Sequence, residues 1–131
     1  MKLRALVVDD SKIMRAMVMQ SLRQSGLAEF EFTEAVDGAD ALQNFNPKKI
    51  DIVFADWNMP NLSGIDFVKM IRRTGETDHI PVVMVTSEKA MGKIEEALDR
   101  AGANAFITKP FTVDYIVRKV GPVIESIGKA A

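Results

Sequence analysis

The chain has 131 residues, of which 47% are hydrophobic and 27% charged, with a formal net charge of -1 and no cysteine. This composition predicts one compact domain and excludes a disulfide framework, a cysteine nucleophile and a cysteine-ligated metal. There is no strongly basic stretch, so we expect no direct binding to nucleic acid. The N-terminal apolar run meets carboxylates after Val8. We therefore expect neither a signal peptide nor a membrane span, and a cytoplasmic location.

Five short apolar runs predict β-strands, and longer segments separate them. The runs are 3–8, 29–34, 51–56, 81–86 and 104–108. The first, third and fourth runs are almost wholly apolar, which is typical of strands covered on both faces. In the second run Phe30 and Phe32 alternate with polar residues, as in an edge strand.

Helical periodicity predicts a helix after each run. The predicted helices begin at Ile13 and end at Gly26, then cover 37–45, 63–73, about 89–101 and 113–127. Met14 and Met17 are expected on the buried face of the first helix, together with Ile13, Val18 and Leu22. Pro122, preceded by Gly121, should bend or split the last helix.

The alternation of strand and helix predicts an α/β fold, a doubly wound five-stranded parallel sheet with five helices. We expect the strand order 2-1-3-4-5. In such sheets, ligands bind outside the carboxyl ends of the strands, where the winding direction reverses. Chemically active side chains gather at these ends: Asp9 and Asp10, Asp56, Thr86 and Ser87, and Lys109 followed by Pro110.

Three carboxylates in one cleft need a counter-charge, and hard oxygen ligands favour Mg²⁺, with Mn²⁺ as a substitute. If the ion binds Asp10 and Asp56, an oxygen of Asp56 faces the anion that the ion recruits. Mg²⁺ together with a lysine typically recruits a phosphoryl group. A carboxylate nucleophile would then form an acyl phosphate.

Each of these residues alone has a plainer interpretation. Aspartates after a strand commonly cap the next helix, which would suit Asp9 and Asp10. Thr86 alone would be a turn residue, and Lys109 alone a solvated charge. Their convergence at one edge of the sheet favours the combined site.

Four motifs carry a family resemblance: VVDDS at 7–11, DWNMPNLSG at 56–64, VTSE at 85–88 and KPF at 109–111. In their order and spacing the sequence resembles the receiver domain of bacterial two-component response regulators over essentially its whole length. Within that family it is most similar to the single-domain chemotaxis members. The resemblance implies a flavodoxin-like, CheY-like fold, with 1–131 as a single receiver domain and no output domain.

The resemblance also implies residue roles. Asp56 matches the phosphorylated aspartate. The Mg²⁺ ligands would be Asp10, Asp56 and the backbone carbonyl of Asn58, with Asp9 acting through water. Lys109 matches the lysine that pairs with the phosphoryl oxygens, and Pro110 the proline whose cis bond aims that lysine inward.

Other matched positions would control switching and lifetime. Thr86 matches the hydroxyl that turns toward the phosphoryl group, and Ser87 lies beside it. Asn58 and Glu88 occupy the positions that tune water access and so the lifetime of the acyl phosphate. Phe106 stands at the position of the family's switch aromatic. That residue is often tyrosine, and phenylalanine lacks the hydroxyl that could donate to a partner.

The implied function is that of a phosphoacceptor signalling protein and not an enzyme, beyond self-phosphorylation from small donors and slow autodephosphorylation. The implied partners are a histidine kinase, the flagellar motor switch protein or another protein target, and a phosphatase. The target would bind the face formed by the fourth helix, fifth strand and fifth helix. We expect a monomer that binds neither nucleic acid nor membrane.

Two alternatives stay open at this point. The chain could shuttle or drain phosphate in a phosphorelay outside chemotaxis. It could also be a haloacid-dehalogenase-like phosphatase, although the D-x-D-x-T motif of such enzymes is not present at 56–60. A plain flavodoxin-like scaffold is disfavoured because DDSK stands where a phosphate-binding loop would follow the first strand.

Overall fold

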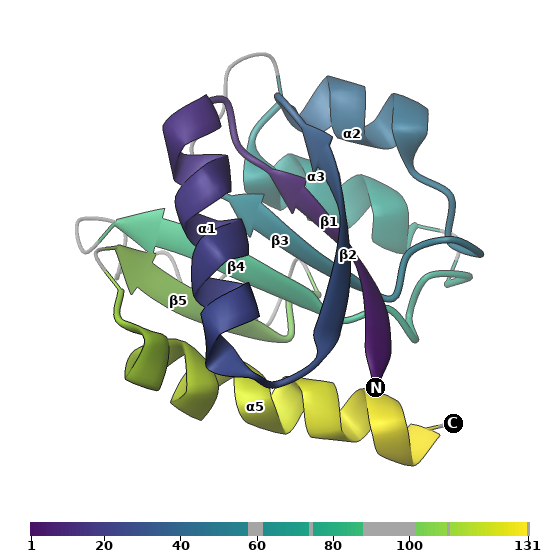
Figure 1. Cartoon of the computed structure of the whole chain (residues 1–131). Helices are drawn as coiled ribbons and strands as arrows, with labels where there is room; N and C mark the ends of the chain where they lie inside the picture. Colours follow the sequence, from purple (N-terminus) through teal and green to yellow (C-terminus); the bar gives the residue numbers. More distant parts are fainter. Residues whose placement is uncertain (58–61, 74, 88–101, 110, 131) are drawn as a thin grey trace.

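The computed structural model describes residues 1–57, 62–73, 75–87, 102–109 and 111–130 (Figure 1). Within these residues five strands form one parallel sheet in the order β2-β1-β3-β4-β5. This confirms the predicted strand order and doubly wound class. The strands are β1 (Lys2–Val8), β2 (Glu29–Ala35), β3 (Ile52–Asp56), β4 (Val82–Ser87) and β5 (Ala105–Lys109).

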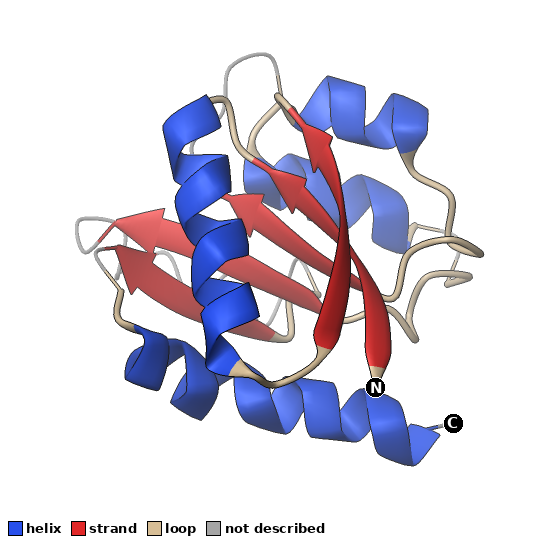
Figure 2. Ribbon diagram, in the orientation of Figure 1, coloured by secondary structure: helices blue, strands red, loops and turns tan. Residues whose placement is uncertain are grey.

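Helices cover both faces of the sheet. Those in the described part of the chain are α1 (Lys12–Ser25), α2 (Gly38–Asn44), α3 (Gly64–Arg72) and α5 (Val113–Ala130). Helices α1 and α5 lie on one face, and α2 and α3 on the other (Figure 2). The helix predicted at about 89–101 lies outside the described residues. None of the described helices is long and apolar enough to span a membrane.

Local signals in the sequence set the ends of the helices. Ser11 caps α1, because its hydroxyl accepts a hydrogen bond from the Met14 amide at 3.2 Å. The cap of this helix is thus neither Asp9 nor Asp10, which removes the plainer interpretation of the two acids as caps. Gly26 ends α1 as predicted, in the left-handed region at φ 70°. Ser63 caps α3 as predicted, accepting from the Asp66 amide at 3.2 Å.

Two apolar layers sandwich the sheet. The side under α1 and α5 buries alternate residues of β1 together with Val18 and Leu22 of α1 and Ile116 of α5. The side under α2 and α3 buries Leu6 and Val8 of β1 with Phe67 of α3. Each strand contributes to both layers because successive side chains point to opposite faces. The central strands are therefore rigid, and their carboxyl ends are fixed relative to one another.

The predicted buried face of α1 is partly wrong. Ile13 is 74% exposed and Met17 is 45% exposed. The face that packs on the sheet carries Arg15, Val18 and Leu22 instead. A residue two positions from Arg15 lies about 200° round the helix axis, so Ile13 and Met17 must point away from the sheet when Arg15 points toward it.

Of the two effects predicted for Pro122, a bend or a split, the split is wrong, since α5 continues through Pro122. Proline removes the hydrogen bond to the carbonyl four residues earlier, that of Arg118. Both Pro122 and Arg118 are exposed, so water can reach that carbonyl. The helix therefore tolerates the missing bond without ending.

Candidate functional site

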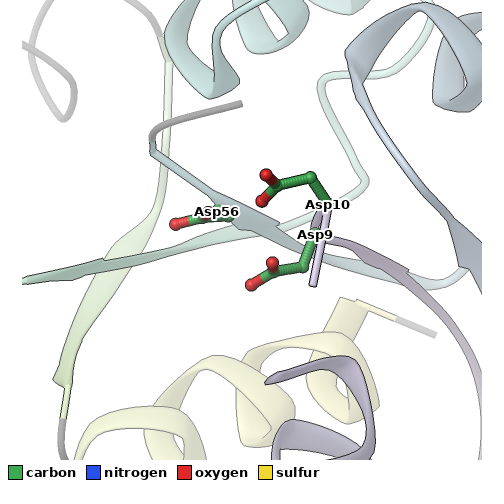
Figure 3. Close-up of side chains that lie close together, drawn as sticks. All are labelled: Asp9, Asp10 and Asp56. Carbon is green, nitrogen blue, oxygen red and sulfur yellow. The ribbon is translucent and has the colours of Figure 1, made fainter. Parts of the chain in front are cut away.

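Strand pairing brings the three predicted acids to one edge of the sheet. Val8 of β1 pairs with Ala55 of β3, so Asp9 follows β1 beside Asp56, the last residue of β3. One ligand oxygen from each of Asp9, Asp10 and Asp56 can be chosen so that all lie within 4.8 Å of one another (Figure 3). Asp9 and Asp56 are 3% and 7% exposed, whereas Asp10 is exposed. The cluster thus has a buried floor and an open side.

A lysine at the end of the edge strand β5 reaches the acid cluster. Lys109 ends β5, where it pairs with Ser87 of β4. Its Nζ lies 3.2 Å from Asp56 Oδ1 and 3.6 Å from Asp9 Oδ2. One ammonium group therefore faces two buried carboxylates, with a third carboxylate beside them.

The surroundings of Asp9 disfavour its ionised form. Burial raises the pKa of Asp9, and the neighbouring Asp10 raises it further. The Ser11 amide, which donates to Asp9 Oδ1 at 2.8 Å, and Lys109 lower the pKa of Asp9, but burial outweighs them. Lys109 therefore does not fully offset the cost of ionising Asp9 in its buried position.

These residues fit a hard divalent cation. The donors are carboxylate oxygens, they converge within 4.8 Å, and the exposed Asp10 leaves a side open to water ligands. Mg²⁺ is bound by proteins in this way, through one or two carboxylates with several waters retained. A dication would also offset the cost that burial imposes on ionised Asp9.

Comparison with known proteins identifies the family of this chain. Residues 5–121 match the family model of the response regulator receiver domain. The chain belongs to the response-regulator receiver family. The chemotaxis protein CheY-3 of Vibrio cholerae is 39% identical over 125 residues, 95% of this chain and 94% of that protein. CheY of Pseudomonas aeruginosa is 35% identical, over 95% of this chain and 98% of its own.

A solved structure gives the same fold for this receiver domain. The V. cholerae chemotaxis protein CheY4 superimposes with a TM-score of 0.76 at 29% identity, covering 97% of this chain and 99% of that one. The CheY-like assignment from sequence is thus confirmed. The family is one of signalling proteins and not of classical enzymes, so the comparisons leave the phosphatase alternative without support.

Of the predicted switch residues in this receiver domain, Thr86 lies on the strand next to Asp56, and Phe106 lies on β5. Thr86 is 1% exposed on β4, one position beyond Val85, the pairing partner of Asp56. Phe106 on β5 is partly buried against the apolar layer under α2 and α3. Lys119 of α5 lies over its ring, with Nζ 4.3 Å from the ring centroid. This cation–π contact stabilises the Phe106 ring through its face, although the ring has no hydroxyl.

Some predicted site residues lie outside the described residues: Asn58, Glu88 and Pro110. Their predicted roles remain predictions. Ser87 is described only through its backbone, as the last residue of β4. Trp57, the residue after Asp56, is 5% exposed and packs in the apolar layer under α2 and α3.

Two residues near the site were missed by sequence reasoning. Lys119 covers Phe106, as described above. Arg15 is 9% exposed and donates to the Asp9 carbonyl at 2.7 Å. A signal for Arg15 did exist, because a charged residue at spacing i, i+3 and i+7 with Val18 and Leu22 occupies the apolar stripe of a helix.

Proposed function

We propose that the protein is a phosphoacceptor response regulator in which Asp56 receives a phosphoryl group from a histidine kinase. The observation that carries this proposal is the contact of Lys109 Nζ with Asp56 Oδ1 at 3.2 Å, within a cluster of three carboxylates. A lysine and an acid cluster that suits a cation both lie beside the Asp56 carboxylate. This arrangement favours the binding of a phosphoryl group at Asp56.

The proposed transfer is an in-line displacement. An oxygen of the Asp56 carboxylate forms a bond to phosphorus while the P–N bond of the kinase phosphohistidine breaks. The histidine nitrogen keeps the electron pair and then takes a proton. Lys109 stabilises the negative charge on the phosphoryl oxygens through a charge-assisted hydrogen bond.

Mg²⁺ would be held by Asp10, Asp56 and the backbone carbonyl of Asn58, with Asp9 acting through water. When bound, the ion supplies charge neutralisation for the transferring phosphoryl group. Asp9 contributes a carboxyl group at the buried floor of the cluster, and the Ser11 amide fixes its orientation. Asn58 and Glu88 would set access of water to the acyl phosphate, and a cis bond before Pro110 would aim Lys109.

Phosphorylation would change the surface through Thr86 and Phe106. Thr86 moves toward the phosphoryl oxygens, and Phe106 moves into the space that it leaves, with Ser87 beside them. The face formed by β5, α5 and the helix predicted at about 89–101 then gains affinity for a protein target. Turning a 1:99 equilibrium over to 99:1 requires about 5.5 kcal/mol of differential stabilisation, which a few charge-assisted bonds approach.

Chemotaxis is the pathway that we propose, with the flagellar motor switch protein as the target. The relatives named above are chemotaxis proteins that align with this chain over nearly their whole length, which supports the chemotaxis pathway for this receiver domain. We further propose a cytoplasmic monomer whose acyl phosphate is lost by slow autodephosphorylation or through a phosphatase.

Labelling from radioactive acetyl phosphate in the presence of Mg²⁺ tests the phosphoacceptor. Wild-type protein should be labelled, and Asp56→Asn should lose the label. Asp51→Asn is the matched control because it removes a carboxylate at the opposite end of β3. Label that persists undiminished in Asp56→Asn would reject the assignment.

A binding assay separates chemotaxis from the phosphate-sink alternative. Motor switch protein is titrated with the receiver domain in the presence and absence of beryllofluoride, which mimics the phosphoryl group. We expect beryllofluoride to tighten binding at least tenfold. Equal binding under both conditions, combined with normal labelling of Asp56, would favour the sink.

A further inference from the structure

Arg15 connects three elements beneath the acid cluster. It lies on the buried face of α1 and is 9% exposed. One of its nitrogens, Nη1, donates to the backbone carbonyl of Asp9 at 2.7 Å, and Nε donates to Glu34 Oε1 of β2 at 3.0 Å. An arginine buried in an apolar layer is costly unless it is paired and hydrogen-bonded, and Arg15 is both.

The bond to Asp9 acts on the peptide group that joins the two adjacent aspartates. The carbonyl of Asp9 and the amide nitrogen of Asp10 belong to one planar unit. The Asp9 amide donates to the Ala35 carbonyl at 3.1 Å, so the residue is also held from β2. With both ends of Asp9 fixed, the direction in which the chain enters Asp10 is fixed as well.

We propose that Arg15 is a positioning residue, which holds the Asp9–Asp10 peptide so that both carboxylates reach the group formed with Asp56. The consequence of this positioning is the affinity of the acid cluster for Mg²⁺, and in that respect the inference rests on the proposed function. Residues that orient metal ligands without touching the metal typically change metal affinity by 10- to 100-fold when they are replaced.

The planar fork of arginine is required for this role. Two nitrogens of one rigid group reach the Asp9 carbonyl and Glu34 at the same time, whereas a lysine offers a single flexible ammonium. The charge of Arg15 has the opposite effect on metal affinity, because a cation near the cluster competes with Mg²⁺. Positioning and charge must therefore be separated by the choice of variants.

Three variants make this separation. Arg15→Lys keeps the charge and loses the fork. The double variant Arg15→Met with Glu34→Gln removes the pair with no change in net charge. The matched control, Arg4→Met with Asp51→Asn, removes a different arginine–carboxylate pair, which joins β1 to the residue before β3. Should the double variant at Arg15 fail to fold, Glu34→Gln alone weakens only the outer contact, since Glu34 is 46% exposed.

Titration calorimetry with Mg²⁺ is the main measurement. We expect Kd to rise about tenfold in Arg15→Met with Glu34→Gln, and less in Arg15→Lys and in Glu34→Gln alone. The control should lose thermal stability while Kd stays within twofold of wild type. A purely structural role for Arg15 would lower stability and leave Kd unchanged, and that result would overturn the proposal.

A second measurement does not depend on the metal. In a crystal structure of metal-free Arg15→Met with Glu34→Gln, we expect the Asp10 carboxylate to have left the 4.8 Å group that it forms with Asp9 and Asp56. If the carboxylate stays in place, the positioning role is wrong. Wild-type protein that binds no Mg²⁺ would contradict the proposed function instead, and the crystal structure would still decide the role of Arg15.

Discussion

Gly64, the first residue of α3, packs directly against the backbone of Asp56. A Cβ added at Gly64 would lie less than 3.0 Å from the Asp56 carbonyl oxygen and 2.8 Å from Cε of Met84. The Gly64 amide also donates to the Trp57 carbonyl at 3.1 Å. The start of α3 is therefore seated on the end of the strand that presents the proposed phosphoacceptor.

Gly64→Ala should displace Asp56 as well as destabilise the fold. Backbone cannot yield as a flexible side chain can, so we expect the free energy of unfolding to fall by about 1–3 kcal/mol, with slower labelling of Asp56 from acetyl phosphate. The control is Gly121→Ala in α5, where a Cβ would meet only Leu27 Cδ2, at 3.6 Å. Wild-type stability and labelling in Gly64→Ala would contradict the close packing.

Mg²⁺ should stabilise the folded protein through the acid cluster. A ligand that binds only the folded state adds about 2.7 kcal/mol at one hundred times its Kd. We expect the melting temperature to rise with Mg²⁺ and to return on addition of EDTA. Asp10→Asn should remove most of the rise because it deletes one donor of the cluster, whereas Asp66→Asn on α3 should keep it. A full rise in Asp10→Asn would show that Mg²⁺ binds elsewhere.

The pair of Arg4 and Asp51 should make stability sensitive to acid. Burial raises the pKa of Asp51, but hydrogen bonds from the Arg4 amide and guanidinium outweigh burial and hold that pKa below its ordinary value. A carboxyl group with a lowered folded pKa stabilises the fold above its unfolded pKa of about 3.9, and the contribution is lost as pH falls through the folded value.

Asp51→Asn tests this sign. The melting temperature of the variant should lie below that of wild type at pH 7, and the gap should close as the pH falls below the unfolded pKa of about 3.9. Glu29→Gln, which replaces an exposed acid of β2, serves as the control and should show no such closing gap. A gap that widens toward low pH would contradict the lowered pKa of Asp51.

The sheet and the acid cluster were predictable because their signals are local. Apolar runs mark the strands, and the residue that follows each run marks a point on the carboxyl edge of the sheet. Asp9, Asp10 and Asp56 could thus be placed together from sequence, and their ligand oxygens do lie within 4.8 Å. Lys109 follows the same rule, because it stands at the carboxyl end of β5, and its Nζ contacts Asp56.

The surroundings of the cluster were not predictable in the same way. Which face of α1 packs inward depends on the bonds of Arg15 to the Asp9 carbonyl and to Glu34, and these partners meet only in the folded chain. Counting apolar residues therefore assigned Ile13 to the core, although it is 74% exposed. The contact of Lys119 with Phe106 joins two elements through side chains and leaves no periodic signal in the sequence.

Pro122 offers a test of how α5 tolerates a missing hydrogen bond. Proline in a helix interior lowers stability by about 3 kcal/mol relative to alanine. Replacing a proline also gives the unfolded chain more freedom, which lowers stability by about 1 kcal/mol. Since α5 is continuous and Pro122 is exposed, Pro122→Ala should raise the free energy of unfolding by about 2 kcal/mol, as measured by urea denaturation. Pro47 lies in the loop between α2 and β3, so Pro47→Ala restores no helical hydrogen bond and should leave the free energy of unfolding equal or lower. A loss of stability in Pro122→Ala would mean that the proline fixes a bend that α5 needs to pack against α1 and β5.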